Sequence, residues 1–227
     1  MKYIQIAILG ILFSTTLQAQ LLNEIGVFVG GANYSGDIGR ETYIAPNRFA
    51  ASLVYKRNIN SRISLRSTFS YYDISAADKN SSNEGRRMRD LEFSNPITEL
   101  ALGLEVSYWD YDITSRHHSF TPYIVVEFAG MYYDTVSSEV NHELNYTNKI
   151  SYAIPFGLGF KSKLAGRIGY AVEVRAQYTF EDDIDFNHPD IPSLQFGNPN
   201  TNDWYFFSGV SLVYSFGRPP CAVPRTF

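Results

Sequence analysis

One stretch of fifteen residues, Arg167 to Glu181, constrains the fold of this chain more than any other. Its sequence is RIGYAVEVRAQYTFE, in which every second residue from Ile168 to Phe180 is apolar and the residues between are small, polar or charged. Because side chains on a β-strand alternate between two faces, such a strand would be apolar on one face and polar on the other. At about 3.3 Å per residue it is long enough to cross a bilayer at a tilt. The stretch therefore predicts a membrane-spanning strand between lipid and a polar lumen.

Seven further stretches alternate in the same way, which predicts an all-β fold, an eight-stranded antiparallel transmembrane β-barrel with a narrow polar lumen. The connections alternate between long and short, and the first is long. Single-chain barrels of outer membranes have short periplasmic turns and longer outer loops, so both termini are expected in the periplasm. The expected strands are Asn23–Tyr34, Arg48–Asn58, Arg62–Asp73, Ile97–Trp109, Thr121–Tyr133, Ile150–Ser162, Arg167–Glu181 and Asp203–Phe216.

The competing interpretation is a secreted soluble barrel or sandwich, whose polar face would meet water. Small residues on the polar face argue against it, because a narrow lumen needs them and a wet surface does not. The 17 Tyr and 16 Phe also suit the aromatic belts of a membrane barrel. The small residues are Gly26, Gly30, Ala101, Gly103, Gly157, Gly159, Gly169, Ala171 and Gly209.

The first nineteen residues resemble a secretory signal, with Lys2 before an apolar core and a cleavage point expected between Ala19 and Gln20. The alternative is a retained N-terminal anchor. The expected organisation is then a signal peptide at 1–19, a barrel at 20–216 and a proline-rich periplasmic tail at 217–227. Without Lys2 the chain has 18 basic and 23 acidic residues, a net charge of −5, which excludes a nucleic-acid footprint. The single cysteine excludes an intramolecular disulfide framework.

Charged residues on the polar faces of six strands are expected to point into the lumen. They could form an ion pathway or a salt-bridged plug. Buried charges are tolerated only when partners satisfy them, which favours the plug. The predicted lumen network consists of Lys56, Arg66, Glu105, Glu127, Lys161, Glu173 and Arg175.

Nothing in the sequence supports catalysis, a cofactor or a metal site. A Ser–His nucleophile needs a histidine beside it, but the four histidines lie in expected turns and loops, and no serine has a G-x-S-x-G setting. An acidic stretch after the seventh strand lacks the spacing of a known calcium loop, so a solvated acidic loop is expected. Basic residues of another expected outer loop could pair with it or with lipid phosphates. The acidic residues are Glu181, Asp182, Asp183, Asp185 and Asp190, and the basic ones are Arg86, Arg87 and Arg89.

Four segments resemble the PorG-like (DUF6089) outer-membrane proteins of gliding and oral Bacteroidetes-type bacteria. They are EIGVFVGGANYSGDIG at Glu24–Gly39, LVYKRNINSRISLR at Leu53–Arg66, PFGLGFK at Pro155–Lys161 and NDWYFFSGVSLVYSFGRPPC at Asn202–Cys221. The resemblance implies an association with the type IX secretion system. There, such barrels accompany a periplasmic ring built from a lipoprotein and its soluble partner.

On this resemblance we expect a non-enzymatic outer-membrane barrel that anchors or positions the periplasmic ring, with the outer-membrane translocon as a further candidate partner. The alternative is a standalone barrel for envelope stability or surface adhesion. Partner contacts are expected at the periplasmic end, in the turns near Asn60 and Ala165. Cys221, an odd cysteine in an exported protein, suggests either an intermolecular bond or a free thiol. Further contact candidates are Arg116, His117, His118, Arg218 and Cys221.

Overall fold

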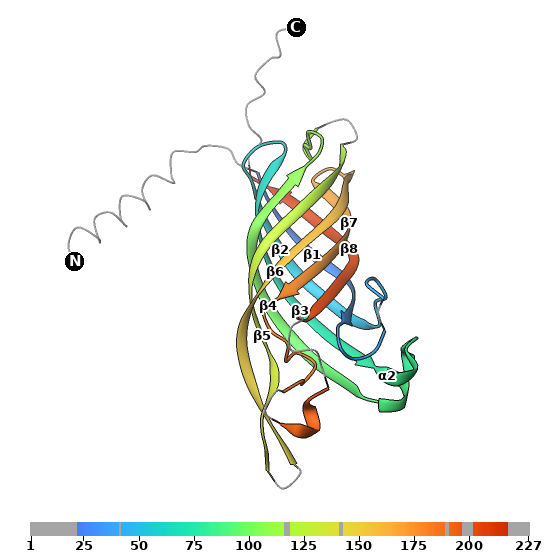
Figure 1. The fold of residues 1–227 in the computed structure, drawn as a ribbon. Coiled ribbons are helices and arrows are strands. Elements are labelled where there is room, and N and C mark those ends of the chain that lie inside the picture. Colours follow the sequence, from blue (N-terminus) through green and yellow to red (C-terminus); the bar gives the residue numbers. More distant parts are fainter. Residues whose placement is uncertain are drawn as a thin grey trace, which may run out of the picture.

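A computed structural model describes residues 22–40, 42–115, 119–140, 143–188, 191–196 and 202–217 of the chain. Eight antiparallel strands form one closed sheet in sequence order, with β8 paired to β1 (Figure 1). The predicted eight-stranded antiparallel barrel is therefore confirmed. The strands are β1 (Asn23–Ser35), β2 (Arg48–Asn58), β3 (Ile63–Ala77), β4 (Glu92–Ser107), β5 (Phe120–Val140), β6 (Glu143–Ala165), β7 (Ile168–Thr179) and β8 (Trp204–Phe216).

In the described part of the chain, three short helices lie in the connections rather than in the wall of the barrel. Between β3 and β4 are the 3-10 helix η2 (Asp78–Asn80) and the helix α2 (Glu84–Arg89), and between β7 and β8 is the 3-10 helix η3 (Pro192–Leu194). Asn83 begins α2, because its side-chain oxygen accepts the backbone N–H of Gly85 at 2.9 Å. Across the ranges given above, no helix is both long enough and apolar enough to cross a membrane.

The expected polar loop from Asp134 to Lys149 is wrong, because β5 and β6 continue far beyond the ring as a long hairpin. Val136 pairs with Tyr146, and Asn148 donates a hydrogen bond to the carboxylate of Asp134 at 2.5 Å. Polar composition suggested a loop, but cross-strand side-chain pairs can stabilise a polar ladder. For the same reason β3 and β4 are longer than predicted: β3 continues past Asp73 to Ala77, and β4 begins at Glu92 rather than at Ile97.

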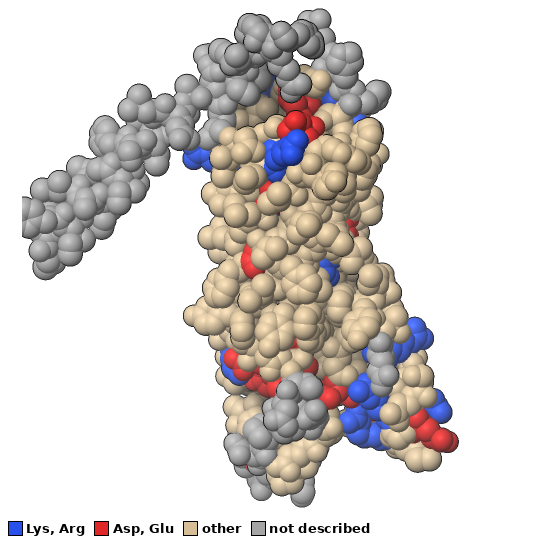
Figure 2. All heavy atoms as spheres, turned by 45° about the horizontal axis from the view of Figure 1, so that its top comes forward, with Lys and Arg blue, Asp and Glu red and all other residues tan. Residues whose placement is uncertain are grey.

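The two faces of the strands lie as the alternation predicts. On β7, Glu173 and Arg175 are buried inside the barrel, whereas Ile168 and Val172 are more than 40% exposed on its outer wall. Figure 2 shows that the wall between the two ends carries few charged side chains on the face in view. An exposed apolar wall of this extent needs lipid to cover it, so the barrel is a membrane-embedded one.

The barrel has two distinct ends. At the terminal end, Asn23 of β1 pairs with Phe216 of β8, and the β2–β3, β4–β5 and β6–β7 connections lie there. The opposite, loop end carries the other four connections (Figure 1). Exposed aromatic side chains form a girdle near each end, as in membrane barrels. The girdle at the terminal end contains Tyr55, Tyr108, Trp109, Phe120, Phe160, Tyr170, Tyr214 and Phe216, and that at the loop end contains Phe49, Tyr71, Tyr132, Tyr152 and Phe180.

Candidate functional site

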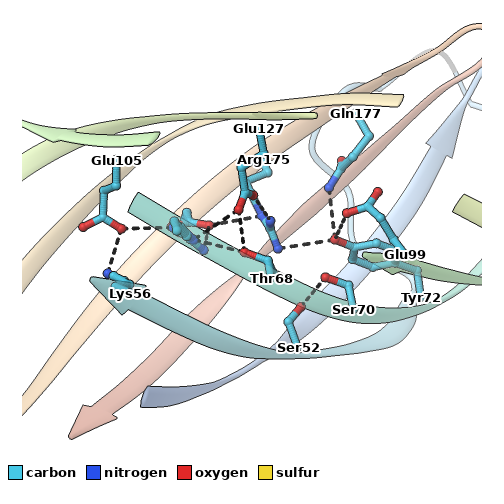
Figure 3. Close-up of polar contacts among 12 residues, drawn as sticks. Ser52, Lys56, Thr68, Ser70, Tyr72, Glu99, Glu105, Glu127, Arg175 and Gln177 are labelled. Atoms are coloured by element: carbon cyan, nitrogen blue, oxygen red, sulfur yellow. Dashed lines mark hydrogen bonds and ion pairs between the residues drawn. The ribbon is translucent and has the colours of Figure 1, made fainter. Parts of the chain in front are cut away.

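The bore of the barrel contains all seven charged side chains predicted to face the lumen. Each is at most 5% exposed, and together they project inward from strands β2 to β7. Figure 3 labels four of them and shows Lys56 pointing toward Glu105 and Arg175 toward Glu127. The seven side chains are Lys56, Arg66, Glu105, Glu127, Lys161, Glu173 and Arg175.

Nearest the terminal end, three cations surround the carboxylate of Glu105. Lys161 Nζ lies 2.6 Å from Glu105 Oε1, and Lys56 Nζ lies 2.7 Å from Glu105 Oε2. Arg66 Nη1 donates to the same Oε2 at 3.2 Å. Glu105 therefore joins β2, β3 and β6 across the bore, and its two oxygens are satisfied by charged donors.

The middle of the bore is held by Arg66 and Arg175 with two further carboxylates. Arg66 donates to Glu173 through Nη1 at 2.7 Å and Nη2 at 3.0 Å. Arg175 Nη1 donates to Glu127 at 3.0 Å, and Thr68 donates its hydroxyl proton to the same carboxylate at 2.7 Å. Arg175 Nε lies 3.1 Å from Glu173 Oε1 without an aligned hydrogen bond.

Toward the loop end the network also contains Glu99, which is not among the residues predicted from the sequence. Tyr205 donates its hydroxyl proton to Glu99 at 2.6 Å, and Tyr72 contacts the other oxygen at 3.4 Å. Arg175 Nη2 donates to the hydroxyl of Tyr72 at 3.3 Å. With Glu99, and with Glu24 buried near the terminal end, four cations and five carboxylates lie inside the bore. The missed signal was its spacing, because Glu99 precedes Glu105 by an even number of residues on β4 and so shares its inward face.

Glycines on the inner face make room for this network. A Cβ on Gly159 would lie 2.3 Å from the ring of Tyr123, whose hydroxyl donates to Glu173. A Cβ on Gly157 would lie 2.7 Å from Cγ of Arg175. These small residues allow large polar side chains of facing strands to cross the narrow bore.

The terminal end of the bore is closed by the connection between β4 and β5. Tyr111 and Ile113 of this connection are buried, and Lys161 Nζ lies 4.6 Å from the centre of the Tyr111 ring. Both side chains lie close to Gly169 on the inner face of β7. The sequence predicts only a turn between the fourth and fifth strands, because nothing local shows that Tyr111 and Ile113 point inward.

The loop end of the bore is closed by the connection between β7 and β8. The side chain of Asn95 on β4 donates to the backbone carbonyl of Ile184 at 2.8 Å and to that of Asp134 at 2.7 Å. Ile184 and Asp185 are buried, and Phe186 packs edge-on against Phe93. The expectation of a solvated acidic loop is therefore wrong for this part of the acidic stretch, because Ile184 draws its acidic neighbours into the mouth of the barrel.

Two carboxyl groups of this connection share one tyrosine. The Tyr34 hydroxyl lies 2.8 Å from Asp185 Oδ2 and also contacts Asp203 Oδ1. Burial raises the pKa of Asp185 to about 7, and the carboxylates of Asp37 and Asp182 add to the rise. Burial and the neighbouring Asp185 hold the pKa of Asp203 well above its ordinary value. The Tyr34 hydroxyl can donate its single proton to only one of the two carboxyl groups. A proton held by Asp185 or Asp203 therefore forms the second hydrogen bond.

Arg89 and Asp78 tie three connections at the loop end together. Arg89 Nε donates to Asp78 at 2.8 Å, and its Nη groups donate to the backbone carbonyls of Asp37 and Phe196. Burial would raise the pKa of Asp78, but hydrogen bonds from Arg89 and the N–H of Gly39 outweigh it and lower the pKa. Arg89 thus pairs with Asp78 rather than with the acidic stretch.

The other two arginines of this connection donate to backbone carbonyls. Arg86 donates to the carbonyls of Gly36 and Gly39, and Arg87 to those of Ser81 and Ser82.

Several candidates from the sequence lie outside the described residues: the signal segment 1–19, Arg116, His117, His118, Arg218 and Cys221. The turns near Asn60 and Ala165 are described and lie at the terminal end, where Asn60 Oδ1 accepts the backbone N–H groups of Arg62 and Ile63 at 2.8 Å. Within the part of the chain that the structure covers, no three His, Cys, Asp or Glu side chains are arranged to hold a metal ion.

Comparison with solved structures finds several membrane barrels of similar fold. The N-terminal β-barrel domain of Pseudomonas aeruginosa OprF is 12% identical with a TM-score of 0.47, covering 88% of this chain and 100% of that chain. Neisserial surface protein A (NspA) is 8% identical with a TM-score of 0.47, covering 86% and 97% respectively. A major outer membrane protein from Thermus thermophilus is 13% identical with a TM-score of 0.49, covering 86% and 99%.

Sequence comparison identifies the family more directly. No curated protein matches this chain. The model of the family described as "Domain of unknown function (DUF6089)" matches residues 2–225, which is nearly the whole sequence. The chain therefore belongs to the DUF6089 family.

Proposed function

We propose that this chain is an integral outer-membrane barrel that conducts nothing and acts as a membrane-embedded mount for other proteins. One observation carries this proposal: the bore is filled by four cations that form ion pairs with three carboxylates, beside two further buried carboxylates that accept hydrogen bonds from neutral side chains. The groups that form the pairs are Lys56, Arg66, Lys161 and Arg175 with Glu105, Glu127 and Glu173, and the two further carboxylates are Glu99 and Glu24.

Opening such a bore would be costly. An ion that passes must displace cation–carboxylate pairs, and removing one partner from a buried pair costs about 3–5 kcal/mol. Tyr111 and Ile184 would also have to leave their buried positions at the two ends. The arrangement therefore favours a plug over an ion pathway.

Electrical recording in planar lipid bilayers tests the absence of conduction. The folded full-length mature chain should give no stepwise conductance, whereas a 16-stranded porin, with its water-filled channel, should conduct under the same conditions. Stable conductance steps that change in a Lys56→Glu variant would contradict the proposal, because Lys56 lies inside the bore.

For the partner, the resemblance supports a periplasmic ring of the type IX secretion system, built from a lipoprotein and its soluble partner. In this proposal the barrel anchors or positions the ring, its terminal end faces the periplasm, and the outer-membrane translocon is a further candidate neighbour. Contacts would come from the turns near Asn60 and Ala165 and from Arg116, His117, His118, Arg218 and Cys221.

Co-purification of the ring proteins with the barrel tests this assignment. A Cys221→Ser change or deletion of 217–227 should weaken their recovery, because the tail would lie on the periplasmic side. Unchanged recovery after both changes would refute a role of the tail. Deleting the gene should abolish secretion of type IX cargo.

A second candidate is a standalone barrel for envelope stability or surface adhesion. The observation in its favour is the brace at the loop end, where Arg89 and Asp78 hold three connections as one surface. Normal secretion with altered adhesion after gene deletion would favour this candidate over the secretion role.

A further inference from the structure

Among the residues that the structure describes, no strand lies beside one edge of β6. From Glu143 to Ser151 this strand pairs with β5 on one side only, because its pairing with β7 begins at Ala153, opposite Thr179. The last backbone hydrogen bond on that side joins the N–H of Phe180 to the carbonyl of Tyr152 at 3.4 Å. Beyond it, the hairpin of β5 and β6 projects past the ring at the loop end (Figure 1).

The direction of the unpaired backbone groups follows from this last hydrogen bond. The carbonyl of Tyr152 points away from β5, and in a strand every second residue directs its N–H and C=O to the same side. Three steps of two residues span roughly 20 Å. The four residues that point their N–H and C=O groups outward over this length are Leu144, Tyr146, Asn148 and Ile150.

At Leu144, Asn148 and Ile150 this edge lacks the features by which proteins protect exposed edges, whereas at Tyr146 the ring packs edge-on against Phe186 of the β7–β8 connection. Such edges usually carry a charged residue, a proline or a bulge, or are covered by another element. None of the four outward-pointing residues is charged or a proline, and the irregularity of the hairpin lies on β5, between Val136 and Ser138. The one lysine here, Lys149, is engaged in ion pairs with Glu181 at 2.6 Å and Asp183 at 2.9 Å.

The side chains along the edge also suit a neighbouring strand. Ile150 is 74% exposed and Tyr146 is 60% exposed, and both belong to residue types that pair well across strands. They lie four residues apart on the same face of β6, so one face of an added strand would lie beside both.

We propose that this edge binds an extended segment of another polypeptide, which adds to β6 as a further strand. Main-chain hydrogen bonds to the four residues would hold it. The segment would be about seven to nine residues long, without proline at the pairing positions, and β-branched or aromatic beside Tyr146 and Ile150. The inference is independent of the secretion role.

A second copy of the chain does not fit this edge. Two copies in the same membrane with the same orientation are related by an axis along the membrane normal. Strands of such barrels tilt by about 35–45°, so the two β6 strands would cross at roughly 70–90° and could not form a ladder. A flexible segment of a different chain has no such restriction.

Amide hydrogen exchange of the mature chain in lipid nanodiscs, measured by NMR, tests the proposal. The probe is a synthetic nine-residue peptide of alternating threonine and valine. Saturating peptide should slow exchange at Leu144, Tyr146, Asn148 and Ile150 at least tenfold. Exchange at Asn145, Thr147 and Lys149 should stay unchanged, because their N–H groups already bond to β5. Absence of protection at the four amides with millimolar peptide would overturn the proposal.

Two variants of one residue separate the backbone from the side chain. Asn148→Ala and Asn148→Pro both remove the side-chain bond to Asp134, but only proline removes the outward N–H. We expect peptide binding by Asn148→Ala to match the unchanged chain and binding by Asn148→Pro to weaken at least tenfold. Unchanged exchange in β7 verifies that both variants are folded. Equal peptide binding by both variants would contradict the proposal. It would also be contradicted if two barrels in one nanodisc paired through this edge and thereby excluded the peptide.

Discussion

Arg66 on β3 and Glu173 on β7 meet across the full width of the bore through two hydrogen bonds of 2.7 and 3.0 Å. The two strands are four positions apart in a ring of eight, so the pair joins opposite walls of the barrel. Both side chains are buried, and each has further partners of opposite charge. The pair is therefore the central tie of the polar network.

We expect Arg66→Leu to destabilise the barrel by about 3–5 kcal/mol, because it leaves buried carboxylates without a cation. Urea unfolding from lipid vesicles measures the effect. The control is Arg62→Leu, since Arg62 pairs with Asp110 on the exposed surface, where such pairs contribute about 0–1 kcal/mol. A double change of Arg66 and Glu173 to leucine should cost less than Arg66→Leu alone. Equal losses for the two single variants would contradict this account.

A methyl group at Gly159 should disturb the bore. The added Cβ would lie 2.3 Å from the ring of Tyr123, and overpacking of this kind costs about 1–3 kcal/mol. Gly130→Ala is the matched control, because a Cβ there meets no atom within 4 Å. The same unfolding measurement should show a clear loss for Gly159→Ala and none for Gly130→Ala. If Gly159→Ala left the free energy of unfolding unchanged, Tyr123 would not fill the space beside β6.

The mouth closed by the β7–β8 connection should open more readily as the pH rises from about 4 to 7. The closed state raises the pKa values of Asp185, to about 7, and of Asp203, so it binds more protons than the open state in this range. The free energy of opening then falls with pH, by up to about 1.4 kcal/mol per unit for each such group. Hydrogen exchange at Ile184 and Asn187, corrected for intrinsic rates, measures it.

Replacing Asp203 by asparagine should reduce this pH dependence by the share of Asp203, since the amide next to Tyr34 carries no titratable charge, while buried Asp185 keeps its own share. Tyr34, Asp37 and Asp182 remain as the other titratable groups around the pair. Asp90→Asn, an exposed change at the end of α2, should leave the dependence intact. If exchange at Ile184 were independent of pH in the unchanged chain, the shared proton would be disproved.

An arginine on the lipid-facing wall should hinder insertion according to its depth. Leu102 lies midway along the outer face of β4, where arginine costs about 2–4 kcal/mol in membrane barrels. Leu164 lies beyond the aromatic girdle at the terminal end, where the cost is about 0–1 kcal/mol. The free energy of folding, measured at equilibrium in vesicles, should show that Leu102→Arg is much less stable than Leu164→Arg. The reverse order, or equal costs, would disprove the lipid-facing assignment of this wall.

Arg89→Ala should loosen the loop end without unfolding the barrel. Arg89 contacts Asp78 and the carbonyls of two other connections, whereas Arg87 bonds only to the nearby carbonyls of Ser81 and Ser82. Limited proteolysis should cut the connections of Arg89→Ala faster than those of Arg87→Ala. Equal cutting rates would show that the brace does not hold the connections together.

The direction in which each strand faces could be predicted from the sequence because it is a local property. The pleat has a period of two residues, so the charge of Glu173 and the apolar character of Val172 predict which points inward. The strand number and the inward position of seven charged residues rest on the same rule. Glu99 also obeys it, and only its role in the network was missed.

Which groups meet inside the barrel was decided by the tertiary structure alone. Arg66 and Glu173 are 107 residues apart, and only closure of the ring and its register bring them together. The inward folding of Tyr111 and Ile184 and the extension of β5 and β6 likewise depend on partners that are distant or across a strand. Alternation determines the face of a residue because it acts between neighbours, whereas pairing and closure are long-range contacts that no local pattern encodes.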